Sequence, residues 1–316
     1  MGVEDDPAAG RDLAGPRVVE GRANAGQPSQ SAAARPRAAP GAADQDARSG
    51  ASPRRSNALA DADLRDLVRR QFGLNAERYV SSYDHSRGES LDRMLALVDP
   101  KPGWRVLDIA TGGGHTALAF APRVREVVAT DITQEMLDAA ERFIHGKGVT
   151  NVRFAEADAC ALPFEAAEFD LVTCRVAPHH FPDPARFTRE MARVLKPSGV
   201  AGMIDNVVPE DRATGDYINA FEKFRDPSHV RAYTTTEWVR YFTDAGFDIG
   251  HTEIFRKARD FEAWAGLQTV SDSVKAELRK RLETAPPGAA EALAPETREG
   301  KLYFYLTEIL IVARRP

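Results

Sequence analysis

Three consecutive glycines, Gly112-Gly113-Gly114, lie between a short apolar run at residues 106–109 and a stretch of helical character. Glycine has no Cβ atom, so the backbone N–H groups of this turn and the following helix N-terminus can approach a ligand closely. One carboxylate, Asp108, lies where the apolar run gives way to the turn. A strand, a glycine turn and a helix in this order are typical of the nucleotide-binding corner of a doubly wound α/β fold.

Two further acids follow the next two apolar runs. Asp131 closes the run at residues 127–130, and a carboxylate at that place can accept hydrogen bonds from both hydroxyls of a ribose. Asp158 comes just after the run at residues 152–155, where a carboxylate beside an adenine pocket can accept from the exocyclic amine. The pattern Gly112-x-Gly114-x-x-Ala117 also satisfies the dinucleotide fingerprint. An NAD(P)-dependent oxidoreductase is therefore a serious alternative.

Asp158 and Asp108 separate the two ligand classes. An NAD(P) enzyme has no general need for an acid at position 158, and a carboxylate at position 108 would lie unfavourably near an anionic pyrophosphate. Asp108 could instead hold the ammonium of an amino-acid moiety, directly or through water. A ligand that combines ribose, adenine and a cationic amino-acid tail is S-adenosylmethionine (SAM).

Alternating strand and helix patterns position these acids at one edge of a sheet. Apolar runs predict strands at residues 104–109, 127–130, 152–155, 169–174, 199–205, 247–255 and 302–312. Helical spacing predicts helices at residues 115–121, 134–145, 184–195, 215–224, 235–245 and 271–283. Residues 156–168 and 285–295 are expected to be mostly loop. The alternation predicts an α/β fold with a doubly wound, seven-stranded, mostly parallel sheet and helices on both faces.

Composition limits the classes of partner and compartment. A net charge of -5 and a pI near 5.9 argue against a general nucleic-acid binder, whose affinity comes from a basic surface. The sequence has no apolar run long enough to span a bilayer, so we expect no integral membrane segment. The two cysteines, Cys160 and Cys174, are expected to pack as small hydrophobes in a reducing cytosol, which predicts a cytoplasmic protein.

Over residues 72–255 the motifs resemble, in order, those of the class I SAM-dependent methyltransferases, within them the group of ubiquinone/menaquinone-biosynthesis C-methyltransferases. Residues 169–172 and 193–199 match later motifs of the family, although Ser198 replaces the usual glycine and Ala110 the commonest first glycine. The resemblance implies a Rossmann-like fold with SAM as cofactor. The residues that it assigns to the cofactor are Tyr79, Asp108, Ala110, Gly112, Gly114, Asp131, Ile132, Met136, Asp158, Ala159 and Arg175.

The resemblance also divides the chain. Residues 1–57 have no aromatic residue and almost no large aliphatic one, which predicts a disordered extension. Residues 58–316 are expected to form the methyltransferase domain, with lid helices at 58–99, a SAM-binding core at 100–206 and acceptor-side insertions with the last strands at 207–316. The first lid helix is expected to be capped at Asp61. A lid would exclude water and fix the methyl donor against its acceptor; the alternative for Tyr79 is that it only packs a helix.

Two adjacent histidines, His179 and His180, follow the fourth strand, where an open α/β sheet presents its substrate. An oxygen, nitrogen or activated-carbon nucleophile usually loses a proton during methyl transfer, and a positioned base contributes about 10²–10⁴-fold. Either histidine could be this base; the alternative is that one of them only shapes the pocket. A metal site with Asp183 is not expected, because no further ligand accompanies them at a recognisable spacing.

The acceptor site is expected to draw on His85, Asn206, His229 and Arg231. His229 and Arg231 could hold an anionic or hydroxylated acceptor; the alternative for Arg231 is a surface ion pair. We expect a small-molecule methyl acceptor, for which the resemblance suggests C-methylation of a quinol-like ring, and a homodimer is considered. Two other classes stay open, an NAD(P)-dependent oxidoreductase and a non-catalytic SAM-binding interaction protein.

Overall fold

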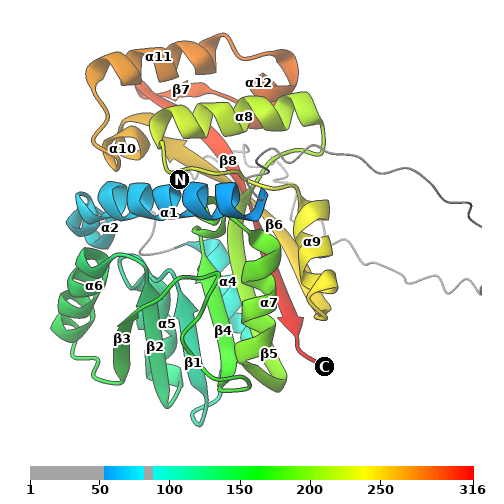
Figure 1. The fold of residues 1–316 in the computed structure, drawn as a ribbon. Helices are drawn as coiled ribbons and strands as arrows, with labels where there is room; N and C mark the ends of the chain where they lie inside the picture. The colour runs from blue at the N-terminus through cyan, green and yellow to red at the C-terminus, as the bar shows by residue number, and fades with distance from the viewer. Residues whose placement is uncertain (1–52, 82–87) are drawn as a thin grey trace, which may run out of the picture.

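The structure, a computed structural model, describes residues 53–81 and 88–316. Within this part of the chain one sheet has the strand order β3-β2-β1-β4-β5-β8-β6, and a short strand, β7, also pairs with β8 (Figure 1). Neighbouring strands from β3 to β5 are parallel, whereas β8 is antiparallel to both β5 and β6. The strands are β1 Arg105–Ile109, β2 Glu126–Asp131, β3 Val152–Glu156, β4 Phe169–Arg175, β5 Leu195–Val207, β6 Asp248–Asp260, β7 Glu296–Arg298 and β8 Lys301–Arg314. The predicted fold class is confirmed.

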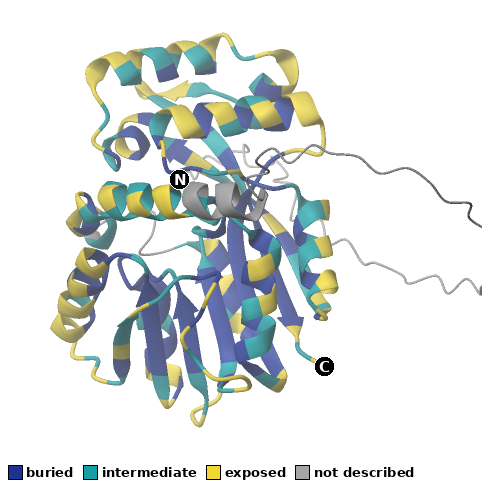
Figure 2. Cartoon of the chain, viewed as in Figure 1, coloured by how far each residue is buried: buried dark blue, intermediate teal, exposed yellow. Residues whose placement is uncertain are grey.

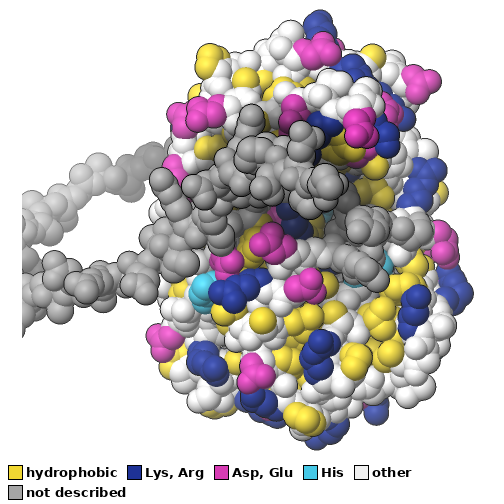
Figure 3. Space-filling model, turned by 180° about the vertical axis from the view of Figure 1, so that it is seen from behind, with side chains coloured by type: hydrophobic (Ala, Val, Ile, Leu, Met, Phe, Trp, Pro, Cys, Tyr) yellow, Lys and Arg dark blue, Asp and Glu magenta, His cyan; other side chains and the backbone are white. Residues whose placement is uncertain are grey.

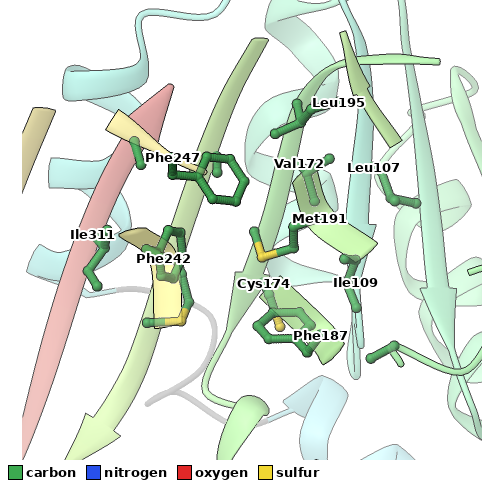
Figure 4. Packing of buried hydrophobic residues seen from close by; sticks show 14 of the residues in the cluster. Leu107, Ile109, Val172, Cys174, Phe187, Met191, Leu195, Phe242, Phe247 and Ile311 are labelled. Carbon is green, nitrogen blue, oxygen red and sulfur yellow. The ribbon is translucent and has the colours of Figure 1, made fainter. Parts of the chain in front are cut away.

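Helices cover both faces of this sheet because successive strand residues point to opposite sides. Leu171 of β4 packs with α4, α5 and α6, whereas the next residue, Val172, packs with α7 and α9. Figure 4 shows the second of these layers, where Phe187 and Met191 of α7 and Phe242 of α9 lie over the strands. Both cysteines are buried in that layer. The bounds are α4 Glu89–Val98, α5 His115–Phe120, α6 Gln134–Gly146, α7 Pro184–Val194 and α9 Thr235–Asp244.

A further group of helices lies beyond the carboxyl ends of the sheet strands (Figures 1 and 2). Strand β8 is paired with β5 only as far as Thr307, and its preceding residues pair with β6 and β7. Four helices pack on this extension around Phe221, Trp264 and Phe304, and we call this part the cap. They are α8 Arg212–Arg225, α10 Phe261–Gly266, α11 Asp272–Glu283 and α12 Pro287–Leu293. Helix α1 (Pro53–Gly73) crosses between the sheet and the cap, followed by the short helix α2 (Ala76–Ser81).

Two boundaries predicted from the sequence are wrong. Helix α1 begins at Pro53, so Asp61 lies inside the helix instead of capping it, and residues 53–57 belong to the helix. Residues 285–295 contain α12, because proline is tolerated in the first turn of a helix and Ala289 and Leu293 bury against the cap. The disorder predicted for residues 1–52 lies outside the described residues.

No helix in the described residues is both long and apolar enough to cross a membrane. On the face seen in Figure 3, Lys and Arg side chains are interspersed with Asp and Glu side chains.

Candidate functional site

A cavity lies at the carboxyl ends of the parallel strands, beneath α1 and α2, with about 980 Å³ of empty space including its opening to solvent. Its walls come from the glycine turn, from the ends of β2 and β4, and from the loop after β3. Nine of the predicted cofactor residues line it, namely Tyr79, Ala110, Gly112, Asp131, Ile132, Met136, Asp158, Ala159 and Arg175. The topology thus brings together side chains that are up to about a hundred positions apart in the sequence.

The three glycines of the turn meet different neighbours. A Cβ atom on Gly112, whose φ is 53°, would have no described atom within 4 Å, so this residue leaves the cavity open. A Cβ on Gly113 would lie 2.9 Å from the Tyr79 carbonyl oxygen, so α2 rests directly on the turn. A Cβ on Gly114 would lie 2.9 Å from Cδ1 of Ile144 in α6. Gly114 therefore allows helix packing and is not part of the cavity wall.

Asp131 and Asp108 differ in how they face the cavity. Asp131 lies in its wall, and its carboxylate accepts hydrogen bonds from the backbone N–H groups of Gly112 and Thr133, both at 3.0 Å. Burial raises the pKa of Asp131, and these N–H groups oppose the shift. Asp108 is buried below the turn and accepts hydrogen bonds from Thr111 and Thr173, at 2.6 and 2.7 Å. Burial raises its pKa to about 6.

The far end of the cavity is closed by α1. Leu64, Val68 and Phe72 give it an apolar wall, and Phe72 packs in one cluster with Met136. Next to them, Nε of Arg65 donates to the Asp158 carboxylate at 2.8 Å. Asp158 also accepts from the backbone N–H of Cys160 at 2.8 Å. No motif in the sequence marks Arg65, since only the folded chain places it beside Asp158.

A cation and a strained residue lie at the end of β4. Arg175 lines the cavity, and its Nε donates to Oγ1 of Thr116 at 3.0 Å. Burial lowers the pKa of Arg175, against the attraction of the Glu308 and Asp108 carboxylates. Val176 has a φ of 53°, which is unfavourable for a β-branched residue and is found mostly where function requires it.

A second, smaller cavity, with about 500 Å³ of empty space including its opening to solvent, adjoins the first on the side of the cap. Phe72, Tyr79, Val176 and His180 line both cavities and therefore form their common boundary. The remaining walls of the second cavity include His179 and Asn206 from the sheet side and Glu222 and Trp264 from the cap. Small molecules in the two cavities would both contact these four residues.

The two adjacent histidines have different surroundings. Nδ1 of His179 lies 2.6 Å from Oδ1 of Asp205, so Nδ1–H donates and Nε2 carries the lone pair when the ring is neutral. Burial lowers the pKa of His179, but Asp205 outweighs it and raises that pKa above the ordinary histidine value. Nδ1–H of His180 donates to the Ser228 carbonyl at 3.0 Å. Burial and the neighbouring His179 lower the pKa of His180 to about 4.

Comparisons with known proteins agree with this arrangement. A family model described as a methyltransferase domain matches residues 107–203. The chain is 44% identical over 172 residues to the uncharacterized methyltransferase YcgJ of Bacillus subtilis, covering 54% of this chain and 68% of that protein. A crystal structure of a Bacillus halodurans protein matches with a TM-score of 0.69 and 38% identity, over 72% of this chain and all of the other. The chain belongs to the class I SAM-dependent methyltransferases.

This methyltransferase is also 38% identical over 125 residues to the demethylmenaquinone methyltransferase of Thermus thermophilus. The matched residues make up 39% of this chain and 56% of that protein. The predicted family resemblance is confirmed. The assignment excludes the NAD(P)-dependent oxidoreductase that the glycine pattern alone left open, and SAM is the cofactor of the family.

Two predicted acceptor residues of the methyltransferase lie outside both cavities. His229 is buried, and its Nε2 pairs with Oδ1 of Asn219 at 2.8 Å, so its ring fixes the loop after α8. The Arg231 side chain is 46% exposed and forms an ion pair with Glu237 at 2.9 Å, which is the surface role considered as its alternative. Asn206 lines the second cavity as predicted, and His85 lies outside the described residues.

The hydrogen bonds that link α2 to the histidines were not predicted from the sequence. Nε2 of Gln268 donates to the Tyr79 hydroxyl at 2.8 Å and to Asp226 at 2.7 Å. Asp226 in turn accepts from the Ser228 hydroxyl at 2.5 Å, and the Ser228 carbonyl holds His180. Gln268 is buried in the cap. Nothing near it in the sequence resembles a motif, because its partners come from distant segments.

Proposed function

We propose that this methyltransferase transfers a methyl group from SAM in the larger cavity to a small organic acceptor in the smaller one. The observation that carries the proposal is the common boundary at Tyr79, Val176 and His180. Methyl transfer requires the reacting atoms to approach within about 3–3.5 Å, and adjoining cavities allow that approach. SAM supplies a methyl group activated by its sulfonium charge.

The lining of the larger cavity fits SAM in its chemistry. Asp131 would accept from the ribose hydroxyls beside the open face of Gly112, and Asp158 from the adenine amine near Ile132, Met136 and Ala159. Arg175 would pair with the carboxylate of the amino-acid tail. Asp108 would act on the ammonium only through an intervening group, because it lies below the turn.

We assign the general base to His179 in preference to His180. Its Nε2 carries the lone pair because Asp205 fixes the proton on Nδ1, and the ring lines the acceptor cavity. As the nucleophile bonds to the methyl carbon, its proton would pass to Nε2, leaving S-adenosylhomocysteine (SAH). His180, at the boundary and neutral because of its low pKa, would position the two reactants.

The acceptor is proposed to be a small organic molecule, and the resemblance to quinone-pathway methyltransferases favours C-methylation of a quinol-like ring. A homodimer and a cytoplasmic location stay predictions.

The competing function is a SAM-binding protein without catalysis. An acceptor screen with methyl-labelled SAM separates the two, since label in a product supports the proposal. Tight SAM binding with no transfer to any small molecule, including those extracted from cells, would favour the non-catalytic protein.

A further inference from the structure

The smaller cavity contains buried polar atoms whose hydrogen-bonding capacity is unused. Oδ1 of Asn206 and Oε1 of Glu222 are buried and have no hydrogen-bond partner among the described residues. Both residues line the cavity, with exposed fractions of 7% and 3%. An unsatisfied buried polar atom destabilises a folded protein, because it has lost its hydrogen bonds to water. Nε of Arg225, in the same wall, is a buried donor without a partner among the described residues. Two unpaired acceptors and one unpaired donor facing one cavity therefore indicate a ligand whose hydroxyl or amino groups supply the missing partners.

The rest of the wall defines the body of that ligand. Phe72, Trp264, Leu267 and Leu306 give the cavity an apolar surface. Its four charged side chains are Arg225, Arg259, Glu222 and Asp226, two of each sign. The cavity thus has no excess of charge to attract an ionic ligand.

We propose that Glu222 and Asn206 determine acceptor specificity, by accepting hydrogen bonds from a neutral molecule that carries hydroxyl or amino donors on an apolar body. The proposal rests on the function proposed above and names the class of molecule that the acceptor site takes. A ligand with the same body but without donors would leave both oxygens unpaired, and polar sites reject such analogues strongly. The cavity thus distinguishes a hydroxylated ring from its methyl ether.

The test uses the three dihydroxybenzene isomers and their dimethyl ethers, titrated into the full chain loaded with SAH. Trp264 lies in the cavity wall, so its fluorescence reports occupancy alongside calorimetry. We expect at least one isomer to bind saturably and its dimethyl ether to bind at least about tenfold more weakly, the effect of one net hydrogen bond. Equal binding of diol and ether, or binding of neither to the SAH-loaded protein, would overturn the proposal.

Variants then assign the preference to residues. Glu222→Met removes the acceptor oxygens while keeping a side chain of similar length. We expect the ratio of diol affinity to ether affinity to fall at least about threefold in this variant. Glu222→Gln keeps one acceptor oxygen and should retain part of that ratio. Asn206→Leu provides an independent second test. Glu283→Met, on the exposed side of α11, is the matched control.

SAH affinity, measured separately, shows that each variant is folded. An unchanged ratio in both Glu222→Met and Asn206→Leu would overturn the assignment. Failure of the wild-type protein to bind SAH would overturn the proposed function instead, so the two failures are distinguishable.

Discussion

His179 and His180 are neighbours in the sequence, yet the folded chain places them in different electrostatic surroundings. Asp205, 26 positions later on β5, holds His179, whereas a backbone carbonyl of the cap loop holds His180. Their spacing alone could predict only that one of them serves as a base. The choice between them depends on partners that the sequence places far away.

The base assignment predicts a pH dependence. The pKa of His179 is raised, and only its neutral form accepts a proton, so kcat/KM should fall as the pH drops through a value above the ordinary pKa of 6.5. Asp205→Asn removes the carboxylate that raises this pKa, so the acidic limb should move to lower pH. His179→Ala should lower kcat by about 10²–10⁴-fold with SAM affinity unchanged. An unshifted limb in Asp205→Asn, together with a normal rate in His179→Ala, would remove His179 from the mechanism.

The sequence motifs predicted residues that line the larger cavity from one short segment. Asp131, Ile132 and Met136 follow a recognisable strand, and the structure places all three in the cavity wall. Glu222 and Gln268 could not be predicted, because their surroundings consist of side chains from α2, β5 and the cap. Each is an ordinary polar residue on a helix or loop until the fold buries it.

At the scale of elements, α2 contacts the glycine turn directly, and we expect this contact to close the larger cavity. Nε2–H of His115 donates to the Tyr79 carbonyl at 3.1 Å, on the same peptide that approaches Gly113. The sequence predicted lid helices within residues 58–99, but neither α2 itself nor its approach to the turn, which depends on the missing Cβ of Gly113. At residues 285–295 the sequence instead predicted the wrong element. The prolines there suggested a loop, but burial against α8 favours a helix.

Gly113→Ala tests this contact. Its Cβ would lie 2.9–3.0 Å from backbone atoms of Tyr79 and Val80, which cannot move without displacing α2. Overpacking of this kind costs about 1–3 kcal/mol, so we expect SAM affinity to fall by about tenfold or more and amide exchange in α2 to rise. Gly146→Ala is the control, since a Cβ there has no described neighbour within 4 Å. Equal SAM affinity in the two variants would show that α2 does not close the cavity.

At the scale of the whole molecule, a buried ionic cluster joins the sheet to the cap extension. Glu308 of β8 is fully buried and pairs with Lys257 and Arg259 of β6, at 2.8 and 3.1 Å. It also accepts from the Ser90 hydroxyl of α4 at 2.9 Å. Alternation of strands and helices was enough to predict the sheet. The cap was not predicted as a unit, because its core combines short helices with the extended ends of β6 and β8.

Glu308→Gln should reduce the free energy of unfolding by about 3–5 kcal/mol, because it leaves buried cations without their carboxylate. Burial raises the pKa of Glu308, but Lys257 and Arg259 outweigh it and lower that pKa below 4.5. The contribution of ionised Glu308 to the free energy of unfolding is therefore present above pH 4.5. It is lost as the pH falls through the lowered pKa of Glu308. Denaturant unfolding between pH 3 and 7 should show the variant approaching wild type at low pH. A pH-independent difference, or a loss no larger than that of exposed Glu283→Gln, would contradict this account.

Asp131 and the glycine turn together form the proposed SAM site. Calorimetric titration of SAM into the wild-type protein and Asp131→Ala tests this directly, with exposed Asp138→Ala on α6 as the control. We predict one saturable site in wild type and control, and affinity about 100-fold or more weaker in Asp131→Ala, because two hydrogen bonds to a carboxylate contribute about 1.5–3 kcal/mol each. Absence of heat with wild-type protein, or undiminished affinity in folded Asp131→Ala, would contradict the account.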